Sequence, residues 1–155
     1  MMTEERKKKT SKAKSSKDLT LRDYQHLAEF RYLLAKFLVF SKQAAQQAGL
    51  APQQHQALLA IKGFPNAADV TVGELAERLA IHPHSATGLV DRLEASGHLI
   101  RRADPIDRRR IVVSLTSTGE DLLRSLSSIH RNEIQRIVPL LKSILSELEL
   151  SPGNR

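Results

Sequence analysis

The sequence predicts a mainly helical protein that carries one small β-hairpin, the α+β class. Over most of the chain, apolar residues recur at alternating spacings of three and four, which is the period of an amphipathic helix. Between residues 99 and 115 the period changes to two, in short runs rich in β-branched residues and arginine. Helices are therefore expected on both sides of a single hairpin.

The first three helices are expected at residues 20–48, 52–61 and 71–79, with a connector at 66–70. Thr20 and Asp23 have the spacing of a capping box, and the apolar stripe of a long helix follows them. Pro52 suits the first position of the second helix because a proline has no N–H to lose there. Thr71 and Glu74 form another capping box before the third helix.

The fourth helix is expected at residues 83–96, with Pro83 at its first position, His82 as its N-cap and Gly97 closing it. Its apolar residues form one narrow stripe. On a helical wheel the residues that point away from this stripe are small or polar: His84, Gly88, Asp91 and Ala95, with Ser85 and Thr87 on its flanks. This face is able to donate and accept hydrogen bonds.

The hairpin is expected at residues 99–115, with turn chemistry in the segment Asp104-Pro-Ile-Asp107 between its strands. Five arginines lie in or beside it: Arg101, Arg102, Arg108, Arg109 and Arg110. Arginine is favoured where planar, forked contacts to phosphates or base edges are needed. The alternative is a solvated hairpin in which these arginines pair with Asp104 and Asp107.

Two helices are expected after the hairpin. Ser117 and Glu120 have capping-box spacing and begin the first of them. Pro139 is expected to break or kink that helix near Val138, because a proline inside a helix removes one hydrogen bond. A last helix then runs to about residue 149.

The order helix, short turn, helix, hairpin is that of a winged helix-turn-helix, in which the second helix of the pair enters the DNA major groove. The outward face of helix 83–96 and the arginine hairpin would then meet the same DNA. Gly88 costs a helix roughly 0.5–1 kcal/mol relative to alanine, and its missing side chain would let the helix lie deep in a groove; simple tolerance is the alternative. Asp91 is interpreted as the structural partner of an arginine in the wing.

Charge and composition narrow the classes of function. Residues 1–17 hold +5 of the net charge of +7 and are expected to form a disordered basic tail before a single domain at 18–155. The chain has no cysteine, which excludes disulfides and thiolate-bound zinc. No apolar stretch is long enough to span a membrane, and no secretory signal is evident, so a cytoplasmic location is expected.

Five segments in a fixed order resemble the MarR family of transcriptional regulators. They are residues 75–79, 84–94, 97–101, 104–109 and 115–119, and the wing sequence Asp104-Pro-Ile-Asp-Arg-Arg109 is the most distinctive of them. The resemblance implies a homodimer in which helices 20–48 and 117–149 interlock, while two winged helix-turn-helix units, residues 52–115, read a pseudo-palindromic operator. It also implies a repressor that a small, often aromatic and anionic, molecule releases from DNA.

The resemblance assigns roles to individual residues. Ser85 and Thr87 are expected to contact bases or phosphates with His84, and Arg108 or Arg109 to enter the minor groove, while Asp107 braces the wing through a salt bridge. The wider DNA-binding set is His82, His84, Ser85, Thr87, Gly88, Arg101, Arg108, Arg109 and Arg110. Titration of His82 and His84 near neutral pH would make DNA affinity vary with pH, but the favoured interpretation is that they are simple polar contacts. Candidate ligand-pocket residues, chosen by side-chain type, are His26, Arg31, Tyr32 and His55.

Two other functions compete with this hypothesis. A metal-responsive regulator is disfavoured because the six histidines show no ligand spacing on a helix, so no metal or other cofactor is expected. A nonspecific nucleic-acid-binding protein is disfavoured because the few aromatic residues lie mostly on the first helix and not at a stacking surface. No catalytic motif is present, and the chain is not expected to be an enzyme.

Overall fold

A computed structural model describes residues 19–65 and 69–150 of the chain, so the tail expected at residues 1–17 lies outside the described residues. It confirms the mainly helical class with a small β-hairpin wing. The elements are α1 (Leu21–Gln47), α2 (Pro52–Lys62), β1 (Val70–Thr71), α3 (Val72–Leu79), α4 (Pro83–Ala95), β2 (Leu99–Ala103), β3 (Ile111–Leu115) and α5 (Ser117–Leu150).

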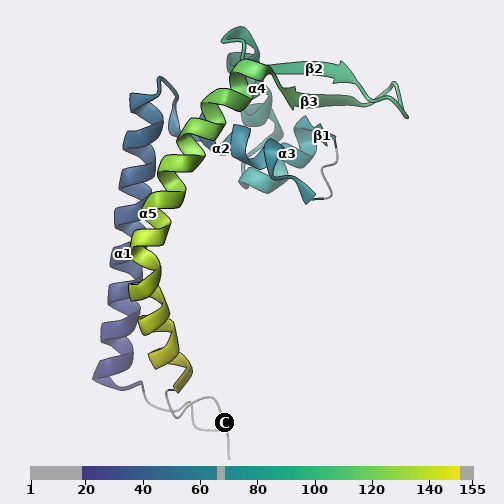
Figure 1. Cartoon of the computed structure of the whole chain (residues 1–155). Coiled ribbons are helices and arrows are strands. Elements are labelled where there is room, and N and C mark those ends of the chain that lie inside the picture. The colour runs from purple at the N-terminus through teal and green to yellow at the C-terminus, as the bar shows by residue number, and fades with distance from the viewer. Residues whose placement is uncertain (1–18, 66–68, 151–155) are drawn as a thin grey trace, which may run out of the picture.

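The molecule consists of a long two-helix arm and a winged domain at one end of it. Helices α1 and α5 lie side by side along the arm, and α2, α3, α4 and the sheet form the domain (Figure 1). An ion pair between Arg22 and Glu147 (2.5 Å) joins the beginning of α1 to the last turns of α5. In the part of the chain that the structure describes, no helix has the length and apolarity of a membrane span.

The sheet is antiparallel, with the strand order β1-β3-β2. Leu99 lies opposite Leu115 in the hairpin, and Val70 lies opposite Val113. The sequence predicted the hairpin but not β1, whose place it gave partly to a connector. A strand of two residues is too short to show the alternation that identifies strands. It forms because β3 offers a free edge beside the start of α3.

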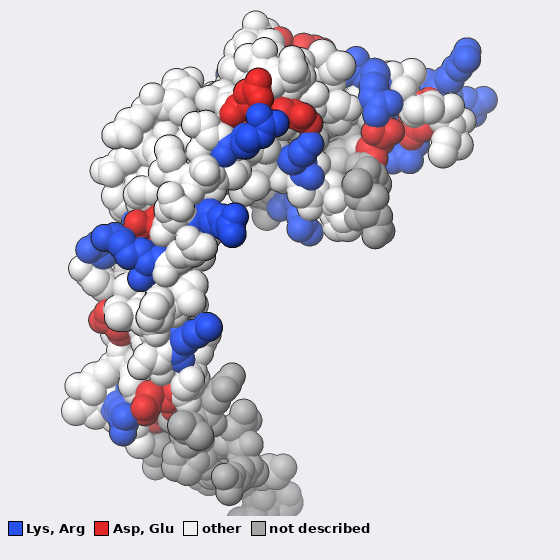
Figure 2. Space-filling model, in the orientation of Figure 1, with Lys and Arg blue, Asp and Glu red and all other residues white. Residues whose placement is uncertain are grey.

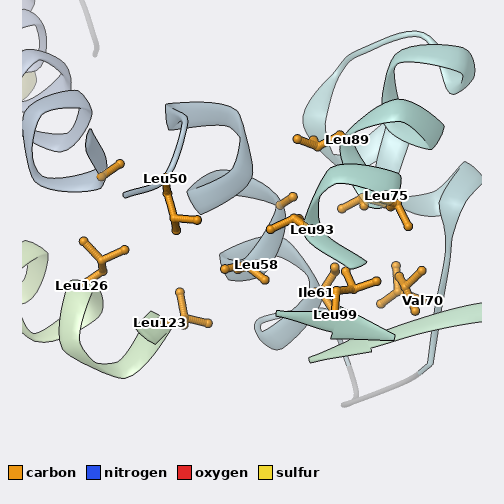
Figure 3. Packing of buried hydrophobic residues seen from close by; sticks show 14 of the residues in the cluster. Leu50, Leu58, Ile61, Val70, Leu75, Leu89, Leu93, Leu99, Leu123 and Leu126 are labelled. Atoms are coloured by element: carbon orange, nitrogen blue, oxygen red, sulfur yellow. The ribbon is translucent and has the colours of Figure 1, made fainter. Parts of the chain in front are cut away.

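The core lies where the helices of the winged domain meet the sheet. Leu58 of α2, Leu75 of α3, Leu93 of α4 and Leu99 of β2 are fully buried together (Figure 3). Leu126 of α5 extends the same cluster toward the arm. Burying each such leucine contributes roughly 1.5–3 kcal/mol, so the core fixes α4 and the hairpin against each other and against the arm.

Helix α5 corrects two expectations. It runs without interruption through Pro139, where two helices were expected. Pro139 is exposed, so the carbonyl that loses its helical hydrogen bond to this residue can accept one from water. Packing against α1 keeps the helix continuous. Its first turn is capped by Thr116 and not Ser117, since the Thr116 hydroxyl accepts from the Gly119 N–H (3.1 Å).

Candidate functional site

Helix α4 presents an unblocked N-terminus and a polar outer face. Its apolar stripe of Ala86, Leu89, Val90 and Leu93 is buried, and this leaves His84, Ser85 and Thr87 exposed. His82 is the N-cap residue by position, but its side chain makes no capping hydrogen bond. The first N–H groups of the helix therefore remain available to an outside acceptor.

The two hydroxyls on this face differ in what they can offer. The Thr87 hydroxyl donates to the Pro83 carbonyl (3.1 Å), so its oxygen is left to accept a hydrogen bond from outside. The Ser85 hydroxyl has no partner within the described residues and is free to donate or accept. Base edges in the major groove carry both hydrogen-bond donors and hydrogen-bond acceptors, so each hydroxyl can find a partner there.

Gly88 lies on the same face, and its surroundings allow a side chain. A Cβ there would meet only the Arg92 guanidinium, at an ordinary contact distance of 3.6 Å. We expect Gly88→Ala to raise the free energy of unfolding by roughly 0.5–1 kcal/mol and to lower affinity for specific DNA, because the added methyl group holds α4 away from the groove floor. Thermal melting and fluorescence anisotropy measure the two effects. Unchanged affinity in a stabilised variant would show that the glycine is merely tolerated.

Arg101 connects α4 to the wing. Its guanidinium bonds the carboxylates of Asp91 and Glu94, and its backbone N–H donates to Glu94 (3.1 Å). The hydrogen bond to Asp91 is the main reason that the pKa of Arg101 is raised. Asp91 thus has an arginine of the wing as its partner. Arg101, which the sequence placed among the DNA-binding residues, is held between two carboxylates and orients the hairpin against α4.

The turn of the wing is organised by Asp104, not by Asp107. Asp104 is only 7% exposed, and it accepts from the N–H groups of Ile106 (2.8 Å) and Asp107 (3.3 Å). These bonds lower the pKa of its carboxyl. Arg110 lies 3.4 Å from the Asp104 carboxylate and 3.4 Å from that of Glu74 in α3.

The salt bridge expected of Asp107 is therefore corrected. Within the residues that the structure describes, Asp107 makes no ion pair, and its carboxylate accepts from the backbone N–H of Arg109 (3.0 Å). The cation that braces the turn is Arg110, and its partner is the buried Asp104. A buried carboxylate next to two backbone donors provides a better-fixed counter-ion than one on the exposed loop.

Only two of the five wing arginines remain unengaged by carboxylates. Arg102 pairs with Asp69 and donates to Ser114, and Arg101 and Arg110 are paired as described. Arg108 and Arg109 are exposed and make no ion pair in the described part of the chain. Cationic side chains gather at the outer end of the hairpin, with acidic ones closer to the body of the domain (Figure 2). The wing thus presents two free guanidinium groups on a braced turn.

A second candidate site lies where α1, α2 and α5 meet. A cavity of about 360 Å³ is lined mainly by apolar surface and by three basic side chains; its walls include Phe37, His55, Leu59, Ser127, His130 and Arg131. Of the four ligand-pocket candidates chosen from the sequence, only His55 lines it; His26, Arg31 and Tyr32 do not. Arg131 and His130 were missed. The spacing of His130 after Leu123 and Leu126 places it on the apolar face of α5, a signal that was available.

The two histidine rings of this cavity are in contact, tilted by 40° to each other. The ring centroids of His55 and His130 are 4.6 Å apart. His130 is fully engaged, with Nδ1 at 2.7 Å from the Leu126 carbonyl and Nε2 at 2.8 Å from the Ser41 hydroxyl. His55 is 3% exposed, and its buried Nδ1 has no partner among the described residues. Burial, and then the neighbouring His130, lower the pKa of His55.

This pair predicts a loss of stability in mild acid. Above pH 6.5, His55 is neutral in both the folded and the unfolded chain; below it, the unfolded chain takes up a proton that the folded chain resists. The melting temperature should therefore fall as the pH decreases through 6.5 toward the lowered pKa. In His55→Leu this fall should be smaller, as measured by calorimetry across the range. Parallel pH profiles for the two proteins would show that His55 does not contribute.

Within 19–65 and 69–150, no three His, Asp or Glu side chains gather as a metal site requires. The described residues that line the cavity include no aspartate or glutamate.

The helix pair α3 and α4, followed by the braced hairpin, defines a winged helix-turn-helix protein. Comparison with known proteins gives the same class. Residues 48–110 match the MarR family. Over this segment the chain is similar to the MarR family, and its sequence relatives are named as transcriptional regulators rather than as enzymes.

Similar proteins include both sequence relatives and solved structures. YcgE, an uncharacterised HTH-type transcriptional regulator of Bacillus subtilis, is 40% identical over 102 residues, which are 63% of this chain and 64% of that protein. Transcriptional regulator Tm0710 of Thermotoga maritima is 28% identical, with a TM-score of 0.60 over 81% of this chain and 90% of that one. A MepR mutant of Staphylococcus aureus bound to an oligodeoxyribonucleotide is 22% identical, with a TM-score of 0.63 over 84% and 96%. The match to YcgE spans just under two thirds of that relative's length.

Proposed function

We propose that this protein is a sequence-specific DNA-binding transcriptional regulator that acts as a homodimer in the cytoplasm. The observation that carries the proposal is the pairing of an exposed polar face on α4 with two unpaired guanidinium groups, Arg108 and Arg109, on a wing that Arg101 fixes to the same helix. The first surface has the chemistry to read base edges, and the second has the charge to bind the phosphate backbone or minor groove. The similar MepR structure contains DNA.

The arm supports dimerisation. Large apolar side chains of α1 and α5 stand exposed on it, among them Leu34, Leu38, Val39, Leu140 and Leu145. A second copy of the chain would cover these side chains symmetrically. Two recognition helices would then lie about one turn of DNA apart. Sedimentation equilibrium should give a dimer, and a stable monomer at micromolar concentration would contradict this arrangement.

The recognition role of α4 has a direct test. Ser85→Ala with Thr87→Ala should reduce the preference for the operator over random DNA by roughly tenfold or more, because bonds to base edges are lost while phosphate contacts remain. Fluorescence anisotropy on both DNAs measures the ratio. Equal weakening on operator and random DNA would contradict base reading by this face. Ser128→Ala, a change on the exposed surface of α5, is the matched control.

We further propose that the protein is a repressor released by a small aromatic anion, bound in the cavity between the arm and the winged domain. The cavity has the size of a small-molecule site, apolar walls for a ring, and basic groups for a negative charge. The cavity is lined by residues of α1, α2 and α5. A ligand bound in it would therefore change the orientation of the winged domain relative to the arm. Adding a panel of phenolic and benzoic acids to a protein–operator complex should release the DNA at millimolar concentration or below.

A further inference from the structure

All charged or chargeable groups at the cavity are bases. His55 comes from α2, and His130 and Arg131 come from α5, while α1 contributes Phe37 and, next to the His130 ring, Ser41. The remaining lining residues are neutral. Among the described residues that line it, no aspartate or glutamate is present to balance a proton. A second positive charge in this cavity therefore lacks a counter-ion among the described residues that line it.

The hydrogen bonds decide which ring can take up that proton. The Leu126 carbonyl only accepts, so Nδ1 of His130 carries a hydrogen, and its Nε2 is then free to accept from the Ser41 hydroxyl. Neutral His130 is thereby satisfied on both sides. His55 has a buried nitrogen without a partner in a cavity large enough for a ligand. An unsatisfied buried nitrogen carries a cost that a ligand group can remove.

We propose that this cavity binds a single-ring carboxylate together with one proton, which His55 takes up. The inference rests on the effector pocket proposed above and adds its regulation by pH. The ligand ring lies against Phe37 and Leu59, and its carboxylate supplies the negative charge that the cavity lacks. In the free protein, burial and His130 oppose a charge on His55; the bound carboxylate removes that opposition. Affinity for the anion therefore increases as the pH decreases.

The probe is benzoate, which stays ionised throughout the measured range, and benzamide is its uncharged counterpart. Isothermal titration of the full chain from about pH 7.5 to 5.5 should show benzoate affinity rising by up to about tenfold per pH unit, the limit for one linked proton. Repeating the titration in buffers of different ionisation enthalpy should give an uptake approaching one proton. Benzamide affinity should stay flat.

Two variants locate the proton. His55→Gln should bind benzoate with a pH-independent affinity, and melting curves confirm that it is folded. Arg131→Gln should bind benzoate several-fold more weakly while keeping the wild-type pH slope, because it removes charge attraction but not the titrating ring. An unchanged slope in His55→Gln would overturn the assignment of the proton to His55.

The same preparation is tested for operator binding at pH 7.5 without benzoate. Operator binding combined with a flat benzoate affinity, or with no benzoate binding at any pH, overturns this inference and leaves the DNA-binding function standing. Proton-linked benzoate binding without operator binding supports the pocket and rejects the regulator. The two failures are thus distinct.

Discussion

Arg108→Ala combined with Arg109→Ala should weaken operator binding by at least roughly a hundredfold. Each guanidinium is exposed and unpaired in the described structure, so it is available for a charge-assisted contact worth roughly 1.5 kcal/mol or more. The proposed homodimer would lose four cations, two on each wing. The plot of log affinity against log salt concentration should therefore become shallower by roughly three to four, at about 0.9 for each lost phosphate contact.

The control for this double variant is Arg136→Ala with Lys142→Ala, which removes the same charge from exposed positions on α5. It should leave the salt slope nearly unchanged. Neither arginine of the wing pair supports the fold through an ion pair in the described residues, so the melting temperature of the wing variant should stay within a degree or two of wild type. A wing variant with a wild-type slope would show that Arg108 and Arg109 do not contact DNA.

Gly119→Ala should destabilise the protein by about 3 kcal/mol and lower its melting temperature by roughly 10 °C. Gly119 lies in the first turn of α5, where a Cβ would fall 2.0 Å from the carbonyl oxygen of His98. That oxygen accepts the Thr116 N–H (3.1 Å), which joins the end of the hairpin to the start of the arm. Relief of the clash therefore requires movement of backbone and not of a flexible side chain. Thermal and chemical unfolding measure the loss.

Gly73→Ala is the matched control for that change. Gly73 lies in the first turn of α3, and its nearest neighbour for a Cβ is the Thr71 hydroxyl at 3.9 Å, an ordinary contact. Alanine there should be neutral or stabilise by a few tenths of a kcal/mol, because it restricts the unfolded chain. If both variants behave alike, the junction between β3 and α5 tolerates movement, and the rigid coupling of wing to arm is wrong.

Local patterns were sufficient to predict most of the fold. Each useful signal involves residues only a few positions apart in the sequence. These signals are the capping pairs that begin at Thr20 and Thr71, Pro83 at the start of α4, and the change of period near residue 99. Strand β1 required pairing with a distant strand, which no local pattern shows. The effect of Pro139 on helix continuity was overestimated, because the packing of α5 against α1 outweighs one lost hydrogen bond.

The candidate sites were harder to predict, because the type of a residue does not show which other residue it contacts. Asp104 and Asp107 look equivalent in the sequence, yet only Asp104 turns inward to two backbone donors and Arg110. Likewise five arginines share the wing, and three of them, Arg101, Arg102 and Arg110, form ion pairs with carboxylates, a pairing that the sequence pattern does not identify. The cavity combines α1, α2 and α5, so His55 was the only one of its lining residues chosen in advance.

Binding-site selection from a random DNA pool tests the central claim most directly. The purified chain of 155 residues is used at two salt concentrations, and the recovered DNA is sequenced. The account predicts enrichment of one inverted repeat with half-sites about ten base pairs apart, retained at the higher salt concentration. Uniform recovery of all sequences with a steep salt dependence would contradict it, because the basic surface would then bind the DNA backbone alone.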